Sequence, residues 1–184
     1  MSLRLRILEK RTPERLKLEM LDELVRLTAD ALGCEPPVWS EQPFAVRLEA
    51  YARLTAHEAE RLLDEEDEAA LQVVRARLWL NAAEFGDALR RRLRVRRAVD
   101  VLRALTLLYG HIGIDLRADR PNAVEVRRCF FSRFYSEPVC ELVSALDEGV
   151  AAGLSGGGEL QFIERKTGGS ACCLARFDLT GVTR

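Results

Sequence analysis

An uninterrupted apolar stripe in the middle of the chain constrains its fold more than any other feature. One face of a predicted helix is formed by Leu71, Val74, Leu78, Ala82, Phe85 and Leu89. The stripe predicts a core helix over residues 67–91. A second stripe begins at Val95, and the step from Leu89 to Val95 turns it away from the first face. We therefore expect a break in the helical structure near residues 90–94.

The residues before this helix also have helical spacing. A proline at the start and a glycine at the end predict a helix over about residues 13–32. Residues 44–63 have the same periodicity, and Ser40 is positioned to cap them. A capping-box pair, Thr55 and Glu58, would divide this segment, so the sequence is compatible with one helix or two.

The chain becomes β-rich after Gly110. Four strand-like segments follow, and their sequences are IGIDL, AVEVRRCFFSRFY, LQFIERKT and SACCLARFDL. The second is predicted as a strand over residues 124–135, and Pro121 marks the turn before it. An amphipathic helix over residues 137–152 separates the two pairs of strands.

The order of these elements predicts an α+β fold, in which N-terminal helices pack on a four-stranded antiparallel sheet of ββαββ order. We expect a single domain over residues 1–184, with a helical part (1–110) and a ββαββ part (111–184). The helices at 67–91 and 137–152 should cover the buried face of the sheet. The apolar stripes of the helical part offer more surface than one small sheet covers, which predicts a homodimer packed through helices.

Composition and charge narrow the classes of partner. Hydrophobic residues make up 48% of the chain and its formal net charge is −1, so it should fold throughout, and it lacks the positive field that attracts nucleic acid or anionic membranes. No apolar stretch has the length of a membrane span, and the charged N-terminus lacks a signal-peptide core, which predicts a cytoplasmic protein. The arginine-rich run at 90–97 is interpreted as a solvated helix face, with a subunit interface or an anionic ligand as alternatives.

Cys129 lies in the predicted strand 124–135. Alternation of side chains places it on the same face as Arg127 and Arg133. Because nearby positive charge lowers the pKa of a thiol, these are the surroundings of a reactive cysteine. The chain has five cysteines, an odd number, and none follows the close repeated spacing of a zinc site. We expect reduced thiols, no metal and no cofactor.

The predicted helix 137–152 carries Cys140 in its first turn, where the helix dipole favours a thiolate. Asp147 and Glu148 follow on the same polar edge of that helix. In the catalytic interpretation Cys140 is the nucleophile, Asp147 orients an amino group or acts as general base through water, and an arginine beside Cys129 holds a substrate carboxylate. The alternative is that Cys140 is an inert core thiol.

The cysteines and the aspartate also fit a longer pattern. It consists of a strand cysteine, a cysteine that opens a helix, an aspartate later in that helix, and a glycine shortly before a cysteine in the last strand. These positions hold Cys129, Cys140, Asp147, Gly169 and Cys173. Over residues 124–178 the chain resembles the L-2-amino-thiazoline-4-carboxylic acid hydrolase family. It departs from that family in its "LARF" ending and at Gly168, where the family has acidic or aromatic residues.

The resemblance implies hydrolysis of a cyclic amidine-type C–N bond in a small amino-acid-derived ring, on the route to cysteine. The candidate site comprises the catalytic residues Cys140, Asp147 and Cys129, and the substrate-binding residues Arg127, Arg133, Glu148 and Cys173. The order of elements is also similar to the vinyl-reductase and TRAPP-subunit group, small α+β domains that bind apolar or cofactor-like ligands and often dimerise. The alternative function is therefore a non-catalytic ligand-binding or assembly domain.

Overall fold

A computed structural model describes residues 2–39, 41–120 and 122–180, so the predictions made at Ser40 and Pro121 lie outside the described residues. The helices are α1 (Leu3–Lys10), α2 (Glu14–Leu32), α3 (Phe44–Glu65), α4 (Glu68–Leu93), α5 (Ala98–His111) and α6 (Glu137–Ser155). The strands are β1 (Asp115–Arg120), β2 (Ala123–Arg128), β3 (Glu159–Glu164) and β4 (Cys173–Asp178). Two single-turn 3₁₀ helices, η1 (Phe131–Arg133) and η2 (Lys166–Gly168), complete the fold.

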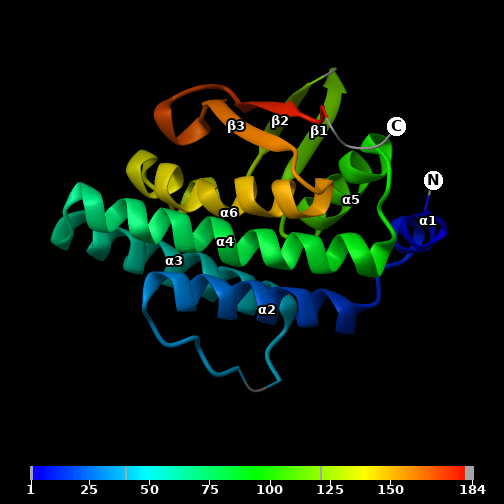
Figure 1. Ribbon diagram of the computed structural model, residues 1–184. Helices are drawn as coiled ribbons and strands as arrows, with labels where there is room; N and C mark the ends of the chain where they lie inside the picture. Colours follow the sequence, from blue (N-terminus) through cyan, green and yellow to red (C-terminus); the bar gives the residue numbers. More distant parts are fainter. Residues whose placement is uncertain (1, 40, 121, 181–184) are drawn as a thin grey trace.

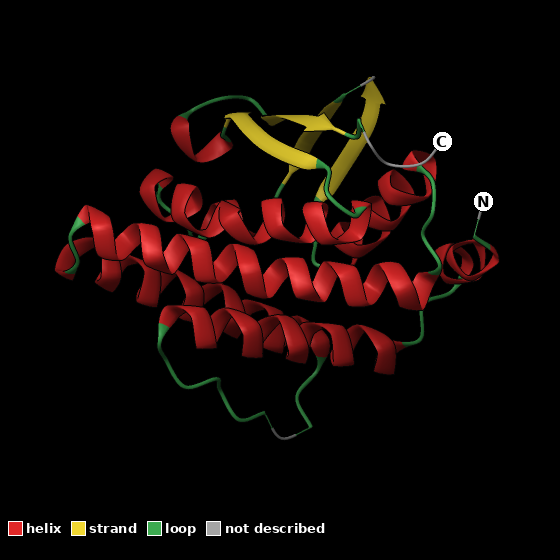
Figure 2. Ribbon diagram, in the orientation of Figure 1, coloured by secondary structure: helices red, strands yellow, loops and turns green. Residues whose placement is uncertain are grey.

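The four strands form one antiparallel sheet in the order β1-β2-β4-β3 (Figure 2). Leu116 of β1 lies opposite Val126 of β2, and Val124 of β2 lies opposite Ala175 of β4. All four side chains are buried, so one face of the sheet belongs to the hydrophobic core. The predicted α+β class and the ββαββ order are confirmed.

The helices form layers on that buried face (Figure 1). α6 packs against β3 and α5 against β1, whereas α4 packs along α6, and α2 packs on α4 and α3. The prediction that α4 covers the sheet is therefore wrong. α4 lies one layer further away, because α6 and α5 already cover the apolar face of the sheet and α6 offers α4 a second face.

Glycines set the close approach of α4 and α6. A Cβ atom on Gly86 of α4 would lie 2.5 Å from the carbonyl oxygen of Val150, and one on Gly149 or Gly153 of α6 would overlap the α4 backbone. The two helices therefore touch backbone to backbone at these three positions. α6, which carries the predicted nucleophile and acid, is fixed between the sheet and α4.

The apolar stripe of α4 is buried as predicted, with Val74, Leu78, Ala82 and Leu89 in the core. The helix starts at Glu68 and is capped by Asp67, whose side chain accepts a hydrogen bond of 2.9 Å from the backbone N–H of Ala70. It ends at Leu93, and the next residue, Arg94, has a positive φ of 54° that reverses the chain before α5. The predicted break is thus confirmed.

The N-terminal half settles one open alternative and adds one helix that was not predicted. α3 is a single helix with Thr55 buried in its interior, so of the two arrangements that the sequence left open, the chain forms one helix. The short helix α1 was not predicted; Ser2 attaches its start to the body of the fold by donating from its hydroxyl to Leu93 O at 2.5 Å. Among the described residues, no helix combines the length and the apolarity that crossing a membrane requires.

Candidate functional site

The segment after β2 turns into the core instead of continuing the strand. β2 ends at Arg128, and η1 follows at Phe131–Arg133, with the Ser132 hydroxyl donating to the carbonyl of Cys129 at 2.8 Å. The Phe131 ring packs edge-on against Tyr51 of α3 at a centroid distance of 5.9 Å. The predicted strand over 124–135 is therefore too long, because burial of the aromatic side chains outweighs their preference for a strand.

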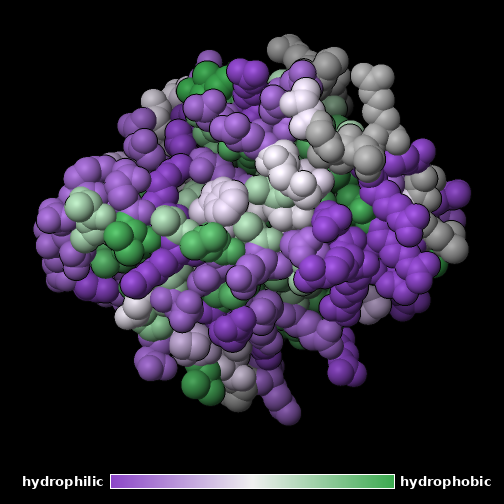
Figure 3. Space-filling view, in the orientation of Figure 1, coloured by the Kyte–Doolittle hydropathy of each residue, from purple (hydrophilic) through white to green (hydrophobic). Residues whose placement is uncertain are grey.

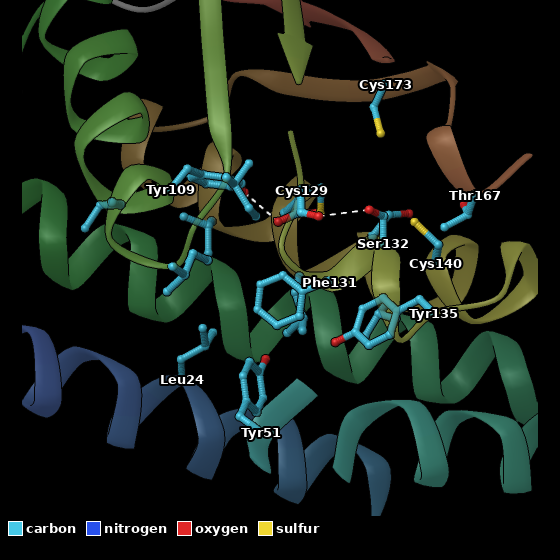
Figure 4. A pocket seen from close by; sticks show the side chains of 18 of the residues that line it. Leu24, Tyr51, Tyr109, Cys129, Phe131, Ser132, Tyr135, Cys140, Thr167 and Cys173 are labelled. Carbon is cyan, nitrogen blue, oxygen red and sulfur yellow. Dashed lines mark hydrogen bonds between the residues drawn. The ribbon is translucent and has the colours of Figure 1, made fainter. Parts of the chain in front are cut away.

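The turn opens a cavity of about 130 Å³ between the helices and the sheet, partly enclosed and partly open to solvent. It is lined mainly by apolar side chains that come from α2, α3, α4, α5, α6, η1, η2 and β4 and from the connections beside them (Figure 4). Among its lining residues are Cys129, Cys140, Asp147 and Cys173. The structure thus brings together four of the seven residues that the sequence singled out.

The other three residues do not line the cavity. Arg127 donates from Nε to Glu125 at 2.7 Å. Arg133 lies over the ring of Phe130, 4.6 Å from its centroid. Glu148 forms an ion pair of 2.8 Å with Arg75 of α4. None of the three is therefore in a position to hold a ligand in this cavity.

Asp147 is the acid of the cavity. The Tyr109 hydroxyl donates a hydrogen bond of 2.6 Å to its Oδ1. Burial raises the pKa of Asp147 to about 6, although the hydrogen bond from Tyr109 acts in the opposite direction. Asp147 is therefore ionised at neutral pH and protonated in mild acid, with a carboxyl group in otherwise apolar surroundings.

The thiols of the cavity have pKa values above the ordinary range. Burial raises the pKa of Cys129 to about 12, and it also raises the pKa values of Cys140 and Cys173. For Cys140 this direction is opposite to the one expected from the helix dipole, because loss of hydration outweighs the dipole in a mostly enclosed site. For Cys129, the charged environment expected from strand alternation is replaced by an apolar one. All three are protonated thiols at neutral pH.

Sequence reasoning missed the phenols of the cavity. Tyr51, Tyr109 and Tyr135 all line it, and burial raises their pKa values. The Tyr51 hydroxyl also lies 3.0 Å from the hydroxyl of Thr28. In the sequence these tyrosines occupy apolar positions of helices or of the aromatic turn, so their pattern indicates only burial.

Sequence reasoning also missed Arg165. It follows β3, donates from Nη2 to the Ser144 hydroxyl at 3.0 Å, and lies over the ring of Phe162. Its charge lowers the pKa values of Asp147, Cys140 and Cys173, although less than burial raises them. Arg165 does not line the cavity, whereas the next residue, Lys166, does. These two residues bring positive charge to the cavity, a role that the sequence analysis gave to Arg127 or Arg133.

The donor set of the cavity does not form a metal centre. The described residues contain no group of three or more histidine, cysteine, aspartate or glutamate side chains placed to hold an ion. Comparisons of the chain with protein-family models, with curated proteins and with solved structures found no match. A function must therefore be argued from the cavity and its residues.

Proposed function

We propose that the chain binds a small molecule in this cavity, and that the ligand has an apolar body and a basic nitrogen held by Asp147. The observation that carries the proposal is a buried carboxyl group, held by a hydrogen bond from Tyr109, in the wall of a largely apolar cavity; burial raises its pKa to about 6. Among the described residues, only the Tyr109 side chain donates a hydrogen bond to the Asp147 carboxyl group. An amine or amidine would supply the carboxylate with the charged partner that its burial calls for.

The size of the cavity supports a ligand of one ring. An engineered apolar cavity of about 150 Å³ holds benzene, and this cavity is of similar volume. The phenols of Tyr51 and Tyr135 add polar edges to aromatic walls, which suits a flat ligand with a polar substituent.

Calorimetric titration with benzylamine and its uncharged analogue benzyl alcohol tests the proposal. Asp147→Asn should weaken benzylamine binding about 10- to 100-fold and leave benzyl alcohol unaffected, because only the amine uses the charge. Glu148→Gln is the matched control, since Glu148 is the next residue but lies outside the cavity. Equal affinities for the two ligands, or an amine affinity that Asp147→Asn leaves unchanged, would contradict the proposal.

A hydrolase of cyclic amidines is the second candidate, and the observation that favours it is that Cys140 and Asp147 line the same cavity. The Cys140 thiol would add to the amidine carbon as its proton passes through water to the Asp147 carboxylate, and Asp147 would return that proton to the ring nitrogen as the ring C–N bond breaks. Water would then attack the same carbon and release the Cys140 thiol. Two measurements test this activity: turnover of 2-amino-thiazoline-4-carboxylate by wild type and Cys140→Ser, and the rate of Cys140 alkylation across a pH series. If alkylation is no faster than that of a free thiol and Cys140→Ser leaves turnover intact, the catalytic role is wrong.

We also propose that the chain pairs with a second copy of itself through its helices, in a reducing compartment such as the cytoplasm. The compartment is supported by the cysteines, since Cys34, Cys129, Cys140, Cys172 and Cys173 are all free thiols. The pairing is supported by large apolar side chains that remain exposed on α4.

A further inference from the structure

One side of α4 faces solvent but is apolar. Opposite the buried stripe, this side carries Val73 and Leu80, whose side chains are 51% and 56% exposed. Ala76 and Ala83 lie beside them at helical spacing, the first exposed and the second half-buried. Figure 3 looks onto this side, where apolar side chains gather along α4 amid polar ones. We call Val73, Ala76, Leu80 and Ala83 the outer stripe of α4.

Two charged residues without partners flank the outer stripe. Within the described part of the chain, Arg77 and Glu84 take part in no hydrogen bond or ion pair. The other charged side chains of α4 all have a partner; they are Glu68, Arg75, Asp87, Arg90, Arg91 and Arg92. Arg77 and Glu84 are thus the two charges on this helix left for a contact outside the chain.

Arg77 and Glu84 have opposite charges and lie two helical turns apart on the same side of the helix. If a second α4 packs antiparallel on the first about a twofold axis, each Arg77 meets the Glu84 of the other copy, since contacts in a twofold interface are reciprocal. The midpoint between the two residues is next to Leu80, which would then meet its own copy. The alanines of the outer stripe let the two helices approach closely.

We infer that the outer stripe of α4 is the seam of a homodimer in which the two α4 helices run antiparallel, with the twofold axis beside Leu80 and reciprocal Arg77–Glu84 pairs on its flank. This inference rests on the proposal that the chain pairs with itself, and it adds the surface and the orientation. A parallel arrangement would place each charge level with its own copy and lose both attractions.

Charge reversal tests the seam, with the dimer dissociation constant measured by sedimentation equilibrium. Arg77→Glu and Glu84→Arg should each raise the dimer dissociation constant at least about tenfold, because each reversal turns both reciprocal pairs of the dimer into pairs of like charge. The double variant should restore it to within about threefold of wild type, since the pairs re-form with their signs exchanged. Glu60→Arg on α3, an exposed reversal away from the seam, should have no effect.

The outcomes separate the two proposals. A wild-type chain that stays monomeric at tens of micromolar overturns both the dimer and the seam. A wild-type dimer that tolerates the single reversals, or that the double variant fails to restore, leaves the dimer standing and overturns the seam. Orientation is tested by crosslinking: Leu80→Cys should form a disulfide with its own copy and Val73→Cys should not, whereas disulfides at both positions would mean parallel helices.

Discussion

Substitution of Gly153 by alanine tests the close packing of α4 and α6 that fixes the cavity. A Cβ atom at this position would overlap the carbonyl oxygen of Ala83 and lie 2.7 Å from the backbone nitrogen of Asp87. Both are helical backbone atoms, which cannot rotate away as a side chain can. The helices must therefore separate along the tightest part of the core.

The cost follows from that separation. Overpacking a core by one methyl group costs about 1–3 kcal/mol, and Gly153→Ala belongs at the upper end because the obstacle is backbone. A loss of about 3 kcal/mol lowers the melting temperature of a domain of this size by roughly 6–12 °C. Thermal unfolding followed by circular dichroism measures the shift.

Gly110→Ala is the matched control. Gly110 also lies in a helix, α5, but a Cβ atom there would have nothing within 4 Å. The same change should raise stability by about 0.5–1 kcal/mol, because alanine is the better helix former. If Gly153→Ala melts at or above the wild-type temperature, α4 and α6 are not in backbone contact and the packing argument fails.

Three further predictions concern Asp147 and its neighbours. Because burial raises its pKa from 3.8 to about 6 in the folded chain, the unfolded chain ionises first as pH rises. Wild type should therefore lose about 2 kcal/mol of stability between pH 4 and pH 7 relative to Asp147→Asn; parallel stability profiles of the two proteins in urea would refute this. Tyr109→Phe removes the hydrogen bond that lowers this pKa, so the loss of benzylamine affinity on acidification should begin at a higher pH, as calorimetry at several pH values would reveal. Arg75→Ala should cost about 1 kcal/mol through its ion pair with Glu148 without altering ligand affinity; a weakened affinity would mean that this pair supports the cavity.

The fold could be predicted from the sequence wherever a periodic pattern was long. The stripe from Leu71 to Leu89 has only one interpretation, and the step to Val95 locates the break because it changes the helix face. α1 escaped prediction because it is a single short helix with alternating arginines, and its position depends on contacts with Leu93 and Asp100 far along the chain. Local pattern carries no information on such contacts.

The candidate site was predictable in part, for a geometric reason. Cys140 and Asp147 lie two turns apart on one helix, so they share a face in any fold that keeps the helix. Arg165 lies in the connection between β3 and η2, where neither the helical nor the strand periodicity of side chains applies. Its position near the cavity depends on how β3 meets η2. The surroundings of Cys129 were predicted wrongly because a run of aromatic residues fits a strand and a buried turn equally well.

α4 was predicted to lie on the sheet because an apolar stripe shows how much surface a helix buries but does not identify the element that covers this surface. The information lay in α6, where Gly149 and Gly153 are one turn apart and remove the side chains from one face. Such a face leaves a groove that a second helix fills by backbone contact, whereas a sheet contacts a helix through larger side chains on both. The opposite face of α6 carries Val143, Ala151 and Leu154, which are buried and suit a sheet. Two different faces on α6 therefore imply that α6 is the middle layer, with α4 on its glycine side and the cavity where its cysteine and aspartate meet the sheet.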